Sequence, residues 1–241
     1  RLSAERVSEA EYGDDPAALG DYSASTHVQG ELIAAMMDLE IRNATRGRRS
    51  MDDVMGLMME RYAADRGFTG RDVERVIAEV CGCNVTTFFD AHVRGGKAIP
   101  FDDYLRYIGL RADVAWRPAL GQDGRPVPDL RAFPYDPGDG TGVRLKISDA
   151  SSAWGKAGLH TGDRLRTMNG QPVAARDAVL GVLRQLKSGD TVRVEVERGG
   201  VRRSATVVMA PFDRPFVQLR DVASPTSAQR ALRARWEAGA P

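Results

Sequence analysis

The chain has 241 residues, which is enough for one large domain or for two of ordinary size. Its 34 basic residues are balanced by 33 acidic ones, so the formal net charge of +1 argues against a dedicated binder of nucleic acids or anionic membranes. No apolar run approaches the ~20 residues that a membrane-spanning helix needs. The sequence begins at Arg1 without an initiator Met or a signal-peptide segment, which predicts a processed or shortened piece.

Residues 1–110 predict an all-α block. The first 24 residues are polar and without clear periodicity, so we expect an irregular lead-in. Apolar residues then recur at helical spacing, and polar residues that favour N-caps precede two of the apolar stretches. The predicted helices begin at or near Gly30, Ser50, Thr69, Thr86 and Pro100. The last of them ends at Gly109.

Strand patterns dominate the second half of the chain. Residues 111–140 are rich in proline, which predicts a linker or edge strands, and residues 141–212 alternate apolar and polar side chains. One helix from about Ala175 to Leu186 interrupts these strands. Tight turns are expected at Asn169-Gly170 and at Gly199-Gly200.

The remaining residues, 213–241, predict a tail with a helix from Ser227 to Glu237 that docks through Leu232 and Trp236. The expected fold class is therefore α+β with two domains. An all-α block is followed by a β-sandwich or barrel with one main helix.

Cys81 and Cys83 are separated by a single residue. This is not the CxxC spacing of redox or zinc sites, and no second Cys or His pair completes a tetrahedral site. A disulfide is one interpretation. Two small buried residues at the end of a helix are the interpretation that we favour.

The segment ISDASSAWGKAGLHTGDRLRTMNG has glycines at each predicted reversal of the chain. With the following helix and the hairpin VRVEVERGGVRRSATV, it resembles a PDZ domain of the bacterial protease type over about residues 112–212. The resemblance implies that an extended peptide or protein C-terminus adds to a strand edge beside the helix. The implied binding residues are Gly140, Thr141 and Gly142 in the turn, Val143 and Leu145 on the strand 143–148, and Ala178, Val179, Val182 and Leu183 on the helix. A PDZ fold that serves only as an intramolecular spacer is the alternative.

Two segments of the first half, GELIAAMMDLEIRNATRGRRSMDDVM and GFTGRDVERVIAEVCGCNVTTFFDAHVRG, are similar to glycyl-aminopeptidase-type zinc metallopeptidases (metallopeptidase family 61). The ending SAQRALRARW is also similar. In that family a PDZ domain follows the catalytic domain. The resemblance implies that the helical block is the C-terminal part of a gluzincin-like catalytic domain, in a periplasmic or secreted bacterial protein.

Such enzymes bind zinc through HExxH on a helix, where the glutamate activates water. The only histidines here are His27, His92 and His160, and HExxH is absent from this sequence. We therefore expect no metal ligand and no catalysis in this fragment by itself. Zinc is expected in the full-length parent, whose N-terminal catalytic part is the implied partner.

Family members often carry tyrosines just before the glycine of the GELxA helix, where a phenol can stabilise a tetrahedral intermediate. Thr26 and His27 stand at the aligned positions, with Tyr22 nearby. We hypothesise that His27 or Tyr22 lines the S1 side of the parent's cleft. The alternative is a residue at the start of a helix without a chemical role.

The leading prediction is the C-terminal fragment of a zinc aminopeptidase-like protein whose PDZ module binds or orients peptides. The alternatives are a non-enzymatic peptide-binding adaptor and a regulatory fragment that pairs with a separate catalytic chain. A helical block separated from its domain exposes apolar surface, which predicts a homodimer of the fragment. The methionines expected to drive it are Met36, Met37, Met55, Met58 and Met59.

Overall fold

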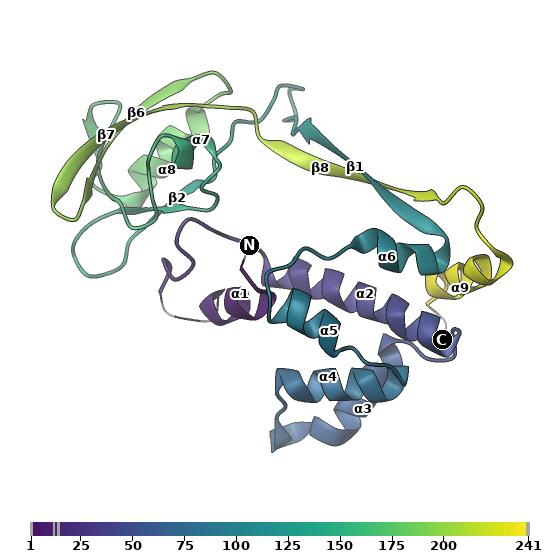
Figure 1. Ribbon diagram of the computed structural model, residues 1–241. Helices are drawn as coiled ribbons and strands as arrows, with labels where there is room; N and C mark the ends of the chain where they lie inside the picture. The colour runs from purple at the N-terminus through teal and green to yellow at the C-terminus, as the bar shows by residue number, and fades with distance from the viewer. Residues whose placement is uncertain (1, 12, 14, 240–241) are drawn as a thin grey trace. The chain divides into compact units, whose positions relative to one another are not determined.

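The computed structural model describes residues 2–11, 13 and 15–239 (Figure 1). Its helices are α1 (Ala4–Glu11), α2 (Thr26–Thr45), α3 (Met51–Tyr62), η1 (Ala64–Arg66), α4 (Gly70–Cys81), α5 (Thr86–Phe88), η2 (Phe89–Val93), α6 (Phe101–Leu105), η3 (Arg106–Ile108), α7 (Ala153–Lys156), α8 (Arg176–Gln185) and α9 (Ser227–Glu237). Its strands are β1 (Leu110–Pro118), β2 (Ala132–Tyr135), β3 (Arg144–Ile147), β4 (Arg164–Met168), β5 (Gln171–Pro172), β6 (Thr191–Arg198), β7 (Val201–Val208) and β8 (Asp213–Asp221). Within the described ranges, every helix is too short or too polar to traverse a bilayer.

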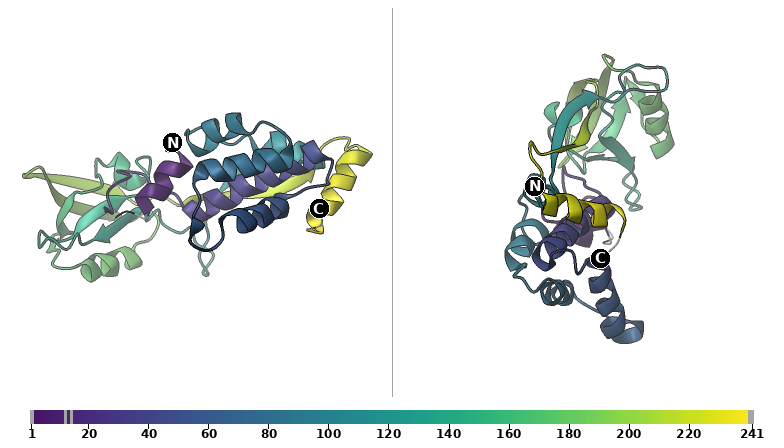
Figure 2. Two further views of the ribbon diagram at one scale, coloured as in Figure 1. Left: turned by 90° about the horizontal axis from the view of Figure 1, so that it is seen from below. Right: turned by 90° about the vertical axis from the view of Figure 1, so that its right-hand side faces the viewer.

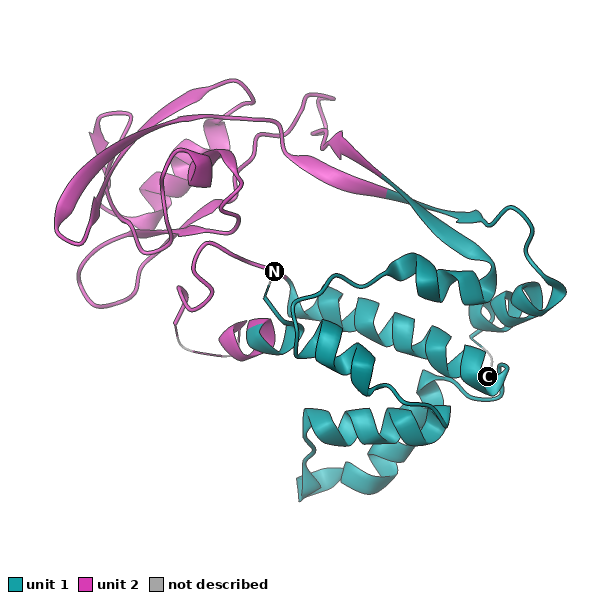
Figure 3. Ribbon diagram, in the orientation of Figure 1, with its two compact units in different colours: residues 1–6, 25–114, 217–241 teal, residues 7–24, 115–216 magenta. Residues whose placement is uncertain are grey.

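The chain divides into two compact units, coloured separately in Figure 3. Unit 1 comprises residues 1–6, 25–114 and 217–241, and unit 2 comprises residues 7–24 and 115–216. Strands β1 and β8 pair in a two-stranded sheet, and each strand passes from one unit to the other. The expected linker therefore contains β1 and β2, and the expected tail contains β8 and α9.

Unit 1 is built around α2, the longest helix with 20 residues, against which α3, α4 and α6 pack (Figure 2). Helix α2 begins at Thr26, earlier than expected, because the Ser25 side chain accepts a hydrogen bond from the Val28 N–H group and caps it. Leu232 and Trp236 of α9 pack on this core, as predicted. The core is formed by Met36, Met37, Leu39, Ile41, Val54, Met58, Val76, Ile77, Cys81, Val85, Phe88, Phe89, Leu105, Ile108 and Leu110.

The two predicted N-caps are confirmed as capping boxes. Ser50 caps α3, and its own N–H group donates to Asp53 Oδ2 at 2.8 Å. Thr69 caps α4, and its N–H group donates to Asp72 Oδ2 at 2.8 Å. Each pair satisfies helix-end groups that would otherwise lack partners. Gly109 ends η3 with φ 72°, a left-handed conformation that glycine adopts without strain.

Two local expectations are wrong. Residues 4–11 form α1, where an irregular lead-in was expected because the sequence shows no clear helical periodicity. Only Val7 of this helix is buried. Cys81 and Cys83 form a disulfide, where two separate buried residues were favoured. Helix α4 ends at Cys81, and Gly82 turns left-handed with φ 63°, which brings the two Cα atoms to 5.1 Å.

Unit 2 contains an antiparallel sheet in the order β2-β3-β4-β6-β7, with β5 paired to β4. The sheet is open at both ends of this order, so the expected sandwich or barrel is not closed. Helix α8 and the short α7 flank it (Figure 1). The predicted turns at Asn169-Gly170 and Gly199-Gly200 are confirmed between β4 and β5 and between β6 and β7. The core is formed by Ala132, Val143, Leu145, Ile147, Trp154, Leu159, Leu165, Met168, Val179, Leu183, Val192, Val194, Val196, Val207 and Met209.

Candidate functional site

The predicted receiving strand, residues 143–148, does not lie at an edge of the sheet. Strand β3 pairs with β2 on one side. On the other side the Leu145 N–H group donates to the Asp163 carbonyl at 2.9 Å, and Gly162 donates to the Leu145 carbonyl at 2.8 Å. The side chains of Val143 and Leu145 are buried in the core. The prediction of a free edge on this strand is therefore wrong.

The free edge belongs to β2, which ends the strand order. The Ser148 N–H group donates to the Arg131 carbonyl at 3.2 Å, so the backbone groups of Arg131 point toward β3. Because backbone groups alternate along a strand, those of Phe133 point toward β3 as well. The backbone groups of Ala132 and Pro134 therefore point away from the sheet. These outward-facing groups form a free edge, which we call the β2 edge.

Helix α8 lies along the β2 edge. The Arg176 Nε group donates to the Pro134 carbonyl at 3.2 Å. Of the predicted helix residues, Val179 and Leu183 are buried in the core of unit 2, and Val182 is partly buried against it. Ala178 is exposed. The helix is thus held by its buried face, with its first residue bonded to the edge strand.

Few main-chain groups remain available at the β2 edge. The Ala132 N–H group donates to the Leu130 carbonyl at 2.7 Å. Pro134 has no N–H group, and its carbonyl already accepts from Arg176. Within the described part of the chain, the Ala132 carbonyl is the one outward group of β2 without a hydrogen-bond partner.

The predicted turn Gly140-Thr141-Gly142 leads into β3 rather than into β2. The polar groups of Thr141 are engaged next to the turn, because Asp139 Oδ1 accepts from the Thr141 N–H group at 2.8 Å and from its hydroxyl at 2.5 Å. These hydrogen bonds from Thr141 lower the pKa of Asp139 below its usual value of 3.8. Asp139 thus serves as an internal partner for the turn.

The two predicted cleft residues, Tyr22 and His27, belong to different units. Tyr22 forms a β-bridge with Asp149 in unit 2. His27 is exposed in the first turn of α2, with its Nδ1 atom 3.4 Å from the Thr26 hydroxyl. Their proposed role in a cleft concerns residues outside this chain, so it stays a prediction.

The other two histidines have local partners. His92 Nδ1 lies 3.0 Å from the Lys97 carbonyl, and His160 Nδ1 lies 2.5 Å from Asp21 Oδ2. Burial raises the pKa of Asp21, but hydrogen bonds from Thr161 and His160 outweigh it and hold that pKa below 3.8. Across the described residues, no group of three or more His, Cys, Asp or Glu side chains has the arrangement of a metal site.

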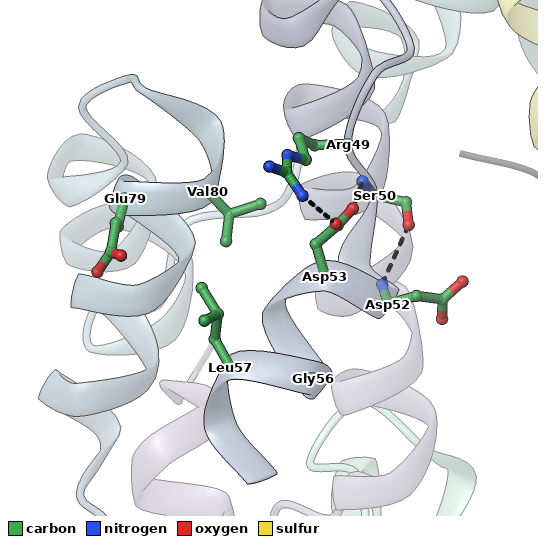
Figure 4. Close-up of a pocket in the computed structure, with 8 residues that line it drawn as sticks. All are labelled: Arg49, Ser50, Asp52, Asp53, Gly56, Leu57, Glu79 and Val80. Atoms are coloured by element: carbon green, nitrogen blue, oxygen red, sulfur yellow. Dashed lines mark hydrogen bonds and ion pairs between the residues drawn. The ribbon is translucent and has the colours of Figure 1, made fainter. Parts of the chain in front are cut away.

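Two cavities in the described part of unit 1 differ in their chemistry. One, of about 680 Å³, lies at the start of α3 (Figure 4). Two of its charged groups pair with each other, since Arg49 Nη1 binds Asp53 Oδ1 at 2.7 Å, and Glu79 pairs with Arg61. The other cavity, of about 400 Å³, has an almost entirely apolar lining that includes the exposed Met55 and Met59. Met36, Met37 and Met58 are buried, so the expectation that all five methionines are exposed is wrong for these three.

One comparison with known proteins concerns the second unit. Residues 119–209 match the family model of the PDZ domain. This stretch contains β2, α8 and the whole β2 edge. No curated protein matches the chain.

One similar solved structure is that of an aminopeptidase N family protein from Idiomarina loihiensis. The sequences are 15% identical, the TM-score is 0.47, and the similarity covers 86% of this chain. The chain spans 36% of the length of that protein.

Proposed function

We propose, on the premise that residues 119–209 form a PDZ domain, that this chain binds extended peptides at the β2 edge. The observation that carries the proposal is the open edge of β2 with α8 beside it. A peptide that adds to such an edge gains main-chain hydrogen bonds, and its alternate side chains contact the neighbouring helix. Leu130, before β2, and Val182, on α8, are partly buried against the core of unit 2, and we expect such a peptide to contact them.

The contacts at the edge determine how a peptide binds. Its N–H group can donate to the Ala132 carbonyl, which has no partner in the described part of the chain. A second main-chain bond requires the Pro134 carbonyl, which Arg176 occupies at 3.2 Å. We therefore expect the Arg176 side chain, which lies against this carbonyl, to compete with a peptide that pairs along the whole strand.

Replacing Arg176 with Ala tests this competition. The change frees the Pro134 carbonyl, and one additional hydrogen bond contributes about 1 kcal/mol. We expect Arg176→Ala to lower the Kd for extended peptides by about fivefold. The measurement is a titration of the full chain with a panel of short peptides. Arg184→Ala, an exposed position on the same helix, is the matched control and leaves the Kd unchanged. Unchanged affinity in Arg176→Ala argues against the β2 edge as the site.

For the whole protein, the proposal is a metallo-aminopeptidase whose PDZ domain binds or orients the peptide. This part rests on the similarity of the segments around GELIAAMMDLEIR to glycyl-aminopeptidase-type enzymes. The Cys81–Cys83 disulfide supports a periplasmic or secreted location, because disulfides persist in oxidising compartments. The zinc would be bound by HExxH in the part of the parent before Arg1.

The coding sequence upstream of Arg1 tests the enzyme proposal directly. We expect it to encode HExxH, and a parent without this motif supports the peptide-binding adaptor instead. In an active parent, the roles of His27 and Tyr22 are tested by replacing each with Phe and measuring kcat and KM. Unchanged turnover in both variants contradicts a position on the S1 side of the cleft.

A further inference from the structure

The turn that leads into the receiving strand determines whether a peptide's terminal carboxylate can be bound. A carboxylate at such a turn is bound by two or three N–H groups that converge on it. Because the receiving strand is β2, the relevant turn comprises residues 127–131. Most of its N–H groups, and that of Ala132, donate within the chain. The Val127 N–H group donates to the Ala119 carbonyl and the Asp129 N–H group to the Ala210 carbonyl, both at 2.8 Å. The Arg131 N–H group donates to Asp129 Oδ1 at 3.2 Å, and the Ala132 N–H group donates to the Leu130 carbonyl at 2.7 Å.

Few donors are left for a ligand. Pro128 has no N–H group. Among the described residues, the Leu130 N–H group is the only backbone donor of this turn without a partner. A single N–H group does not form a carboxylate site of the kind that captures a C-terminus.

A carboxylate of the chain itself occupies this turn. The Asp129 side chain is only 3% exposed and accepts from the Arg131 N–H group, from Arg131 Nε at 2.8 Å and from Arg131 Nη2 at 2.8 Å. Burial raises the pKa of Asp129, but the hydrogen bonds from Arg131 outweigh it and lower that pKa below 3.8. Asp129 is therefore ionised at neutral pH.

The cation at this turn is also fully engaged. Arg131 binds Asp149 in addition to Asp129, so its guanidinium already bridges two carboxylates. A third carboxylate, from a ligand, would meet the negative charge of Asp129 at close range, and like charges repel. Both the hydrogen bonds and the charge thus disfavour a free C-terminus at this position.

We propose that this PDZ domain binds internal extended segments rather than free C-termini, because most N–H groups of the turn before β2 are already bonded within the chain and Asp129 adds a negative charge to that turn. The inference rests on the proposed peptide-binding function and names the class of peptide that the β2 edge accepts. Such a ligand donates an N–H group to the Ala132 carbonyl and places no charge beside Arg131.

The experiment compares matched peptides on the full chain. Each peptide of a panel is made with a free C-terminal carboxylate, with a C-terminal amide, and embedded in a longer segment, and the Kd is measured by fluorescence polarisation. We expect the three forms to agree within about threefold, since the carboxylate makes no net contribution. A loss of about tenfold on amidation overturns the inference and leaves the proposed function standing. If no form of any peptide binds, the proposed function fails, and the inference fails with it.

The variant Asp129→Asn tests the assigned residue. It keeps the shape of the side chain and removes the charge, so Arg131 becomes available to a ligand carboxylate. We expect free-carboxylate peptides to gain about fivefold over their amides in this variant. Asp139→Asn, which removes a carboxylate from the turn before β3, is the control and shows no such gain. An unchanged ratio in a folded Asp129→Asn protein contradicts the role of Asp129. If that variant does not fold, the peptide comparison on the unmodified chain decides.

Discussion

Single carboxylates hold neighbouring elements of unit 1 together. Asp38 accepts from Arg42 Nε at 2.7 Å and from the Met51 N–H group at 2.8 Å, and so joins α2 to the start of α3. Glu74 on α4 binds Arg94 after η2, with Oε2 at 2.8 Å from Arg94 Nη1. The hydrogen bonds from Arg94 lower the pKa of Glu74 below its usual value of 4.5, against the opposing effect of burial. Charge pairing thus contributes to stability even where the chain's net charge is small.

The lowered pKa of Glu74 predicts an acid dependence of stability. The ionised carboxylate stabilises the fold above about pH 4.5, and this contribution is lost as the pH falls through the folded-state pKa. Glu74→Gln should reduce the free energy of unfolding at pH 7 by about 2 kcal/mol and flatten its decline in acid. Urea unfolding at a series of pH values measures both effects. Glu60→Gln, at an exposed position on α3, should change neither.

The glycines in helices α7 and α8 of unit 2 differ in how far the fold requires them. Gly155 lies in α7, and a Cβ atom there would stand 2.3 Å from the Ala150 carbonyl oxygen, closer than any real contact. Gly181 lies in the middle of α8, where a Cβ atom would have nothing within 4 Å. The first glycine is required by tertiary packing, whereas the second is tolerated at the expense of helix propensity.

These two glycines give a matched pair of variants. Gly155→Ala should destabilise unit 2 by about 2 kcal/mol, because the backbone around Ala150 must shift. Gly181→Ala should stabilise it by about 0.5–1 kcal/mol, since alanine favours the helix. Thermal unfolding of both proteins measures the difference. Equal destabilisation by the two changes contradicts the packing around α7.

At the scale of the whole molecule, two separate cores stabilise the chain. Leu39 is fully buried in the core of unit 1, and Leu145 is fully buried in the core of unit 2. The buried residues of each unit form a cluster of their own, and domains with their own cores can unfold independently. We therefore expect two unfolding transitions in calorimetry.

Core variants assign the two transitions. Leu39→Ala and Leu145→Ala should each cost about 3 kcal/mol, because each leaves a cavity. Each change should lower the midpoint of one transition by about 10 °C and leave the other in place. If either variant moves both transitions together, the two units unfold as a single cooperative block.

Local patterns in the sequence were sufficient for the elements whose hydrogen bonds join residues a few positions apart. The caps at Ser50 and Thr69, the turn at Gly199-Gly200 and the helix from Ser227 to Glu237 are confirmed for this reason. The motif around Ile147–Gly170 was also specific enough to predict the PDZ domain that matches residues 119–209.

The order of the strands was decided by the tertiary structure. A four-residue strand containing Pro134 resembled a linker, yet it forms the edge, and β3 lies inside the sheet. One partner of the turn before β2 is also distant in sequence, since Asp129 donates its N–H group to the Ala210 carbonyl. Residue types and spacing therefore determined that this chain carries a PDZ fold. Which edge is free, and which carboxylate fills its turn, depends on long-range pairing that a local pattern does not encode.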